Sequence, residues 1–166
     1  MAISEILLLD YDIEIGNTRR TLALIPEKDP LWKPHEKSMA IGRLAVHVAR
    51  LPNFCTRMLT TPEMNMATEK FPELVFESTA RLLTVLDEAA AEAKSHLAAM
   101  SDEDLGKKWR LSFGDRVVVD APRKVLYRTM FLNHMVHHRA QLGVYLRLLD
   151  IPVPGLYGPS ADEPFN

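Results

Sequence analysis

Four long amphipathic segments, separated by proline-rich or polar breaks, constrain this chain more than any other feature of its sequence. In each segment apolar side chains recur at steps of three and four residues, the period of one face of an α-helix. Each segment is much longer than the average helix of about 11–12 residues. The pattern therefore predicts an all-α fold, an up-and-down four-helix bundle. The predicted helices span residues 4–25, 38–59, 72–100 and 121–149.

The breaks between the segments set the expected boundaries. Three prolines in residues 26–34 indicate an extended connector after the first helix. Ser38 is a suitable N-cap for the second helix, and Pro52 either bends that helix or ends it. Pro72 and Pro122 fit the first turns of the third and fourth helices, where proline is well tolerated.

Residues 107–119 break the helical rhythm. Trp109, Leu111 and Phe113 alternate along the chain, Gly114 and Asp115 are turn formers, and three valines follow. This pattern predicts a short hairpin or extended excursion before the last helix. The final segment, IPVPGLYGPSADEPFN, is expected to be irregular and to pack back onto the helices.

Length and composition exclude several classes of protein. The 166 residues fit one domain over 1–166, and 47% hydrophobic with 25% charged residues is a globular composition. The net charge is −2, and basic and acidic residues alternate along the chain without forming a basic block, so we expect no nucleic-acid partner. The aliphatic runs are too short for a membrane span, and the acidic start is unlike a signal peptide. Cys55, the single cysteine, allows no intrachain disulfide, which fits a cytoplasmic location.

The six histidines hold the strongest chemical signal. His134 and His138 lie four residues apart, so a helix projects both imidazoles from one face, as in helical metal motifs. His138 falls within the apolar stripe of its helix, and burying two imidazoles without partners is costly. His47, beside the stripe of the second helix, is the best candidate for a third ligand. The alternative is a set of core histidines that are hydrogen-bonded to the protein.

The other three histidines fit the metal site less well. His35 lies in the proline-rich connector and is expected to face solvent. His96 lies near the end of the third helix, where it suits the helix dipole. His137 points away from its neighbour His138, toward the edge of any pocket.

Several further residues have both a chemical and a structural interpretation. Cys55 is a candidate nucleophile, but a buried, inert cysteine is the favoured interpretation. Gln141 could orient a histidine, whereas solvation alone would explain Arg139. Asp10 and Glu14 could supply a carboxylate to a pocket, or they could form a solvated face of the first helix. Tyr145 and Tyr157 could line the rim of such a pocket, but packing alone would also explain them.

Three stretches of the sequence resemble DinB-like proteins, a superfamily of bacterial four-helix bundles. They are LAVHVARLPNF around His47, HMVHHRAQLGVYLRLLDIPVPG around His134 and His138, and YGPSADE in the tail. The resemblance implies that these three histidines bind a divalent metal ion, with zinc or nickel as the best candidates. It also implies a homodimer.

The resemblance leaves the activity open. Some members of the superfamily are thiol S-transferases that use bacillithiol or mycothiol, and one group isomerises maleylpyruvate. We therefore expect a metal-dependent enzyme with S-transferase or hydrolase-like chemistry, acting on a small molecule or a low-molecular-weight thiol. Three histidine ligands leave coordination positions open, as catalytic sites do. The alternatives are a non-catalytic metal- or ligand-binding stress-response module and a dimerising scaffold with a vestigial site.

Overall fold

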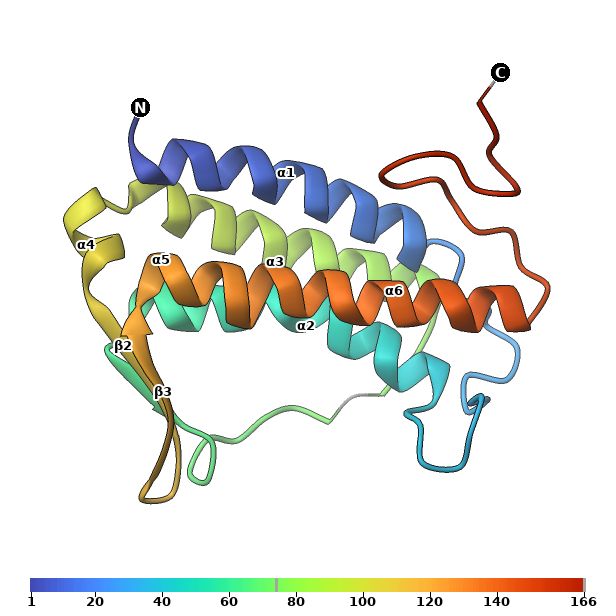
Figure 1. The fold of residues 1–166 in the computed structure, drawn as a ribbon. Coiled ribbons are helices and arrows are strands. Elements are labelled where there is room, and N and C mark those ends of the chain that lie inside the picture. Colours follow the sequence, from blue (N-terminus) through green and yellow to red (C-terminus); the bar gives the residue numbers. More distant parts are fainter. Residues whose placement is uncertain (74, 166) are drawn as a thin grey trace.

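The computed structural model describes residues 1–73 and 75–165 of the chain, which form a mostly helical fold with a small sheet at one end (Figure 1). Among the described residues, no helix combines the length and the apolar character that crossing a membrane requires. The helices in chain order are α1 (Ile3–Leu22), α2 (Ile41–Thr60), α3 (Thr79–Ala99), the short α4 (Asp102–Gly106), α5 (Arg123–Leu126), the π-helical turn η1 (Tyr127–Leu132) and α6 (Asn133–Leu148).

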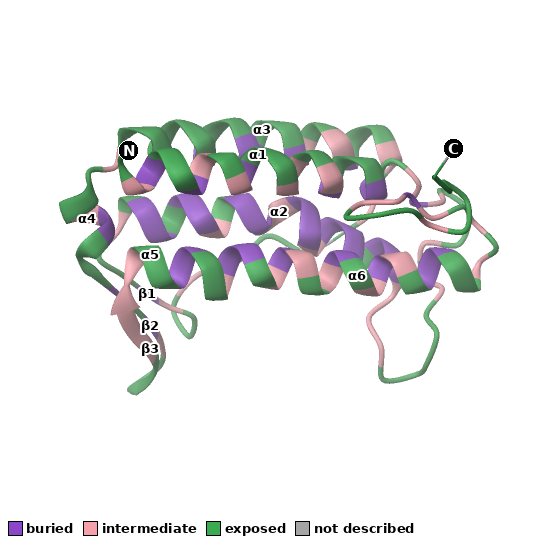
Figure 2. Cartoon of the chain, turned by 45° about the horizontal axis from the view of Figure 1, so that its top comes forward, coloured by how far each residue is buried: buried purple, intermediate pink, exposed green. Residues whose placement is uncertain are grey.

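The long helices lie side by side, and α2 is the most deeply buried of them (Figures 1 and 2). It contacts α3, α6 and η1, and it buries side chains along most of its length. By contrast, α1 and α3 each keep one face exposed. A helix that is buried nearly all round occupies the centre of a fold, so α2 positions its neighbours.

The first helix is shorter than the predicted 4–25. It ends at Leu22, and the next residues form tight turns in which Leu24 and Ile25 donate to the carbonyls of Thr21 and Leu22. Ile25 remains buried in the core, which explains why the apolar pattern extends past the end of the helix.

The second helix begins at Ile41, so the predicted start at Ser38 is wrong. Its first two amide groups donate to carbonyls of the preceding connector, from Ile41 to Trp32 at 2.8 Å and from Gly42 to Pro30 at 2.9 Å. These bonds satisfy amides that a side-chain cap would otherwise bind. The helix then continues through Pro52 to Thr60.

The third helix begins at Thr79, not near Pro72 as predicted. Ser78 is its N-cap, and the Ser78 hydroxyl accepts a hydrogen bond from the amide of Arg81 at 3.1 Å. Val75, which falls within the predicted helix 72–100, is 55% exposed. Residue 74, within the predicted helix, lies outside the described residues.

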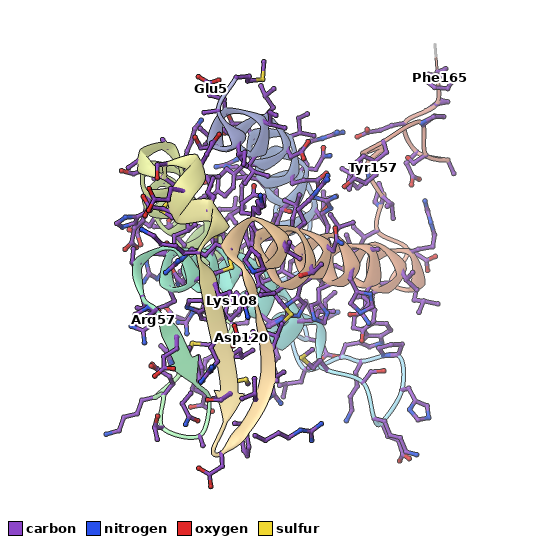
Figure 3. All side chains as sticks on the ribbon, turned by 60° about the vertical axis from the view of Figure 1, so that its left-hand side comes forward. Glu5, Arg57, Lys108, Asp120, Tyr157 and Phe165 are labelled. Atoms are coloured by element: carbon purple, nitrogen blue, oxygen red, sulfur yellow. The ribbon has the colours of Figure 1, made fainter. Side chains whose placement is uncertain are left out.

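The predicted excursion is a β-hairpin, formed by β2 (Lys108–Phe113) and β3 (Arg116–Pro122). Gly114 in its turn has φ +59°, a left-handed conformation that glycine adopts easily. Figure 3 shows Lys108 and Asp120 side by side on the two strands, where they form an ion pair of 3.8 Å. A third strand, β1 (Glu63–Asn65), pairs parallel to β2, in the stretch between the predicted helices 38–59 and 72–100, where no strand was expected.

The last helical segment begins at Arg123, with Pro122 as its N-cap, so the predicted start at 121 is two residues too early. It is interrupted by η1, whose wider turn directly precedes α6. Single π-helical turns within α-helices occur frequently at functional sites. Compared with an uninterrupted α-helix, the wider turn rotates α6 about its axis, and this rotation changes the direction in which the side chains of α6 point.

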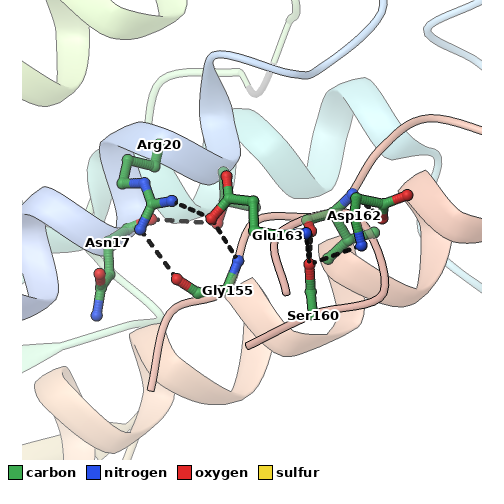
Figure 4. Close-up of polar contacts among 8 residues, drawn as sticks. Asn17, Arg20, Gly155, Ser160, Asp162 and Glu163 are labelled. Atoms are coloured by element: carbon green, nitrogen blue, oxygen red, sulfur yellow. Dashed lines mark hydrogen bonds and ion pairs between the residues drawn. The ribbon is translucent and has the colours of Figure 1, made fainter. Parts of the chain in front are cut away.

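The residues after α6 have no regular structure and pack beside the C-terminal part of α1, in keeping with the expectation that they pack back onto the helices (Figure 1). Figure 4 shows the contacts that hold them. The Arg20 guanidinium donates to the carbonyl of Gly155 at 3.0 Å and pairs with Glu163 at 2.6 Å, and Ser160 accepts hydrogen bonds from the amides of Asp162 and Glu163. The tail is therefore attached to the helices by polar contacts.

Candidate metal centre

Three histidines from two neighbouring helices meet in one place. His47 lies in the middle of α2, and His134 and His138 lie one turn apart on α6. All three are half-buried, so they are accessible from solvent without being fully exposed. The structure thus brings together the three residues that the sequence singled out as candidate ligands.

The ring nitrogens of the three histidines converge. The Nε2 atom of His134 lies 2.8 Å from Nε2 of His138 and 3.4 Å from Nε2 of His47. One nitrogen from each residue lies within 4.8 Å of the other two. The group is therefore compact enough to share one metal ion.

The second nitrogen of two of these rings is already bound to the protein. His134 Nδ1 lies 3.3 Å from the carbonyl oxygen of Met130, and His138 Nδ1 lies 2.7 Å from Oε1 of Gln141. Carbonyl oxygens only accept hydrogen bonds, so each Nδ1 carries the hydrogen and each Nε2 has its lone pair free. Such bonds orient ligating histidines in metalloproteins.

The electrostatics of the group disfavour protonation of His47 and His134. Burial, followed by the nearby charges of His138 and His134, lowers the pKa of His47 to about 4. Burial and His138 also lower the pKa of His134, although its bond to Met130 opposes this shift. These two imidazoles are therefore neutral at pH 7, the form that binds metal.

Two Nε2 lone pairs that face each other at 2.8 Å repel unless a cation lies between them. A proton could take that role, but the lowered pKa of His134 disfavours it. A divalent ion satisfies all three nitrogens at once, and imidazole is a preferred ligand of zinc and nickel. The donor set therefore fits a metal ion.

The remaining histidines stay outside this group. His137 is exposed, and its ring centroid lies 4.9 Å from that of His138 without joining the cluster. His35 is exposed on the connector, where its Nδ1 accepts a hydrogen bond from the amide of Lys37, and His96 is exposed in the last turn of α3. His35 and His96 lie where the sequence analysis expected them.

Cys55 and Asp10 do not contribute to the centre. Cys55 is fully buried, and burial raises the pKa of its thiol, so it is an inert core residue as favoured above. Asp10 forms a long ion pair of 3.4 Å with Arg128 on the surface.

Arg139 is buried with only 2% of its surface exposed, so the interpretation of a solvated side chain is wrong. It pairs with Glu14 of α1 at 2.6 Å and donates to the hydroxyl of Tyr157 in the tail. The sequence analysis missed this contact, because its partners are far apart in the chain and neither belongs to a local pattern.

A cleft of about 540 Å³ lies between α6 and the tail. Arg139, Gly143 and Tyr157 are among its lining residues, and the three histidines are not. Tyr145 is buried elsewhere, where its hydroxyl donates to the carbonyl of Met39. Tyr157 therefore lines a cleft, but one that is separate from the histidine group.

Fold and site together define a mostly helical protein with a three-histidine group able to hold a divalent ion. The model of the DinB family matches residues 12–164, and the chain belongs to this family. No curated protein matches the chain.

Two solved structures share the fold. A DinB-like protein from Bacillus cereus is 21% identical with a TM-score of 0.66, and the match covers 91% of this chain and 95% of that one. A DinB-like protein from Bacillus subtilis is 14% identical with a TM-score of 0.69, covering 90% of this chain and 96% of that one. At these identities the likeness concerns the fold alone.

Proposed function

We propose that this protein binds one divalent metal ion, zinc or nickel, through His47, His134 and His138. In this proposal the four long helical segments act as an up-and-down bundle that holds the ligands. The observation that carries the proposal is the convergence of three Nε2 atoms, two of them on rings whose Nδ1 atoms are held by Met130 and Gln141.

We further propose that the centre is catalytic, with thiol S-transfer or hydrolase-like chemistry. Three imidazole donors leave coordination positions open, which is typical of catalytic rather than structural sites. When bound, the ion supplies a Lewis acid at this position. Burial keeps His47 and His134 neutral, Met130 and Gln141 orient the two rings of α6, and the half-buried rings leave the site accessible to a low-molecular-weight thiol or another small molecule.

A non-catalytic role in metal or ligand binding during stress is the second candidate. The observation that favours it is the position of the 540 Å³ cleft, whose lining does not include the histidines. A catalytic centre usually lies inside such a pocket. A thiol-transferase screen of the metal-loaded protein, with several small thiols and electrophiles, separates the two candidates: metal-dependent turnover supports the first, and binding without turnover supports the second.

Metal content tests the site itself. We expect about one ion per chain in protein purified without a histidine tag, by elemental analysis. His138→Ala should remove the ion and leave the helical circular dichroism unchanged, because the apolar stripes do not depend on His138. His137→Ala is the matched control and should retain the metal. Loss of metal in the control but not in His138→Ala would refute the assignment.

We also propose that the protein is a homodimer. Ile6, Leu9 and Ile13 lie along one side of α1 at steps of three and four, and they are 49%, 62% and 59% exposed. Large apolar side chains in a row on a helix surface commonly mark a protein contact.

A further inference from the structure

The buried ion pair between Arg139 and Glu14 connects the metal-binding helix to two other parts of the chain. Arg139 follows His138 directly, but a step of one residue turns the side chain by about 100° around a helix. The two histidines of α6 therefore face α2, while Arg139 faces α1. One helix carries the proposed ligands on one side and a buried charge on the other.

The contacts of Arg139 restrict how α6 can rotate about its axis and slide along α1. Its Nη1 donates to the carbonyl oxygen of Glu14 at 3.0 Å and to Oγ1 of Thr18 at 3.1 Å, two groups one turn apart on α1. Its Nη2 pairs with the carboxylate of Glu14 at 2.6 Å. Because a guanidinium is planar and rigid, several bonds to one helix restrict both the rotation and the sliding of α6.

The tail completes this arrangement. The hydroxyl of Tyr157 donates to Oε2 of Glu14 at 2.6 Å and accepts a hydrogen bond from Arg139. Burial and the bond to Glu14 raise the pKa of Tyr157, so the phenol keeps its proton. Arg139, Glu14, Thr18 and Tyr157 thus form one network, here called the α1–α6 clamp.

The π-helical turn explains why α6 needs such a restraint. η1 ends at Leu132, just before both histidines of α6, and its wider turn sets the rotation of all that follows. A shift of one residue in this turn would rotate His134 and His138 by about 100°, away from His47. The clamp lies on α6 after this turn, so it holds the part of the helix that carries the ligands.

We propose that Arg139 is a positioning residue for the metal centre: the α1–α6 clamp holds α6 in the rotation at which His134 and His138 face His47, and the tail contributes through Tyr157. The inference rests on the proposed metal-binding function. It implies that the affinity for metal depends on residues that never touch the ion.

The test uses the full chain with two variants. Arg139→Lys keeps the positive charge but loses the planar guanidinium and its several donors, and Tyr157→Phe loses only the hydroxyl. Tyr11→Phe is the control, because Tyr11 also donates a hydrogen bond from its hydroxyl, but this bond is buried and is made to the carbonyl of Ala90 in α3, at 2.8 Å. With Co²⁺ as the probe, we expect both clamp variants to bind about 10- to 100-fold more weakly, with a changed visible spectrum. The control should match the wild type in both respects.

A second readout does not depend on metal. In the metal-free protein, the rings of His47 and His138 lie 4.7 Å apart between centroids, close enough for a nuclear Overhauser effect. This effect should be present in the wild type and the control, and weakened in the clamp variants. If the clamp variants lose only thermal stability, while Co²⁺ affinity, spectrum and ring contact stay at wild-type values, the positioning role is refuted. If the wild type binds no Co²⁺ but the ring contact still depends on the clamp, the metal-binding function alone fails.

Discussion

At the scale of single residues, the hydrogen bonds to the Nδ1 atoms of His134 and His138 are as informative as the convergence of the Nε2 atoms. Gln141 accepts from His138 Nδ1 at 2.7 Å and thereby directs Nε2 toward the other two rings. Gln141→Leu keeps the size of the side chain but removes the acceptor, so we expect metal affinity to fall about 10- to 100-fold. Competition with a chromophoric chelator measures this change.

Gln141→Glu is the control for that prediction, because a carboxylate oxygen can accept the same hydrogen bond. It should keep the affinity near or above that of the wild type. Equal losses in both variants would show that the hydrogen bond to Gln141 does not orient His138.

The lowered pKa of His47 predicts how stability depends on pH. In the metal-free folded protein this pKa is about 4, below the value near 6.5 of an unfolded chain. The unfolded state therefore binds more protons between these values, and the free energy of unfolding falls as pH drops from about 6.5 to 4. Urea unfolding of chelator-treated protein at several pH values measures this decrease.

His47→Gln removes the titrating ring and should reduce the pH dependence over the same range. A wild-type protein whose unfolding free energy stays constant from pH 7 to 4.5 would contradict the expected burial of His47. Addition of metal at pH 7 should raise stability, because the ion binds only the folded arrangement of the three rings.

The sequence predicted some of these residues and not others, for a physical reason. Helical periodicity fixes the relative directions of His134 and His138, and the position of His47 beside the apolar stripe of the second helix, together with the family resemblance, indicated the third residue. Arg139 could not be interpreted in this way, since its partner Glu14 lies 125 residues away and periodicity carries no information on such a contact. The relative directions of nearby side chains on one helix can be predicted from the sequence, whereas the helix that each of these side chains contacts cannot.

At the scale of elements, helix boundaries were the least predictable feature. Both α2 and α3 begin later than expected, α2 because carbonyls of the connector accept its first amides, and α3 because Ser78 caps it several residues after Pro72. The strand β1 was missed because three residues carry little pattern and their pairing with β2 joins distant segments. The hairpin was predicted because its alternation and its Gly114 turn are local signals.

Two glycines test the close approach of the chain at the start of α2: Gly42 lies at this contact, and Gly16 in α1 is the control. A Cβ at Gly42 would lie 2.8 Å from Phe76 Cβ and 2.9 Å from Pro30 Cβ, so Gly42→Ala should destabilise the fold by about 1–3 kcal/mol. Gly16 in α1 has no atom within 4 Å of an added Cβ, so Gly16→Ala should stabilise by about 0.5–1 kcal/mol. Chemical denaturation measures both, and the same sign for both would contradict the close approach at Gly42.

At the scale of the whole molecule, the exposed apolar side chains on α1 predict self-association. Light scattering at tens of micromolar should give twice the mass of one chain. Leu9→Glu places a charge in the row formed with Ile6 and Ile13 and should yield monomers that keep their helical content, because Leu9 is 62% exposed. A wild-type protein that is monomeric at this concentration would refute the dimer.

The distance along the chain between the two ligand-bearing helices has a consequence for biosynthesis. His47 and His134 are 87 residues apart. A ribosome that has released α2 has therefore delivered one candidate ligand, and His134 is added only 87 residues later. A single imidazole holds a divalent ion weakly, so the growing chain cannot capture one at this position. If the proposed metal site is correct, the ion is therefore selected only after α6 has been made and has folded against α2, from the metals that are then available.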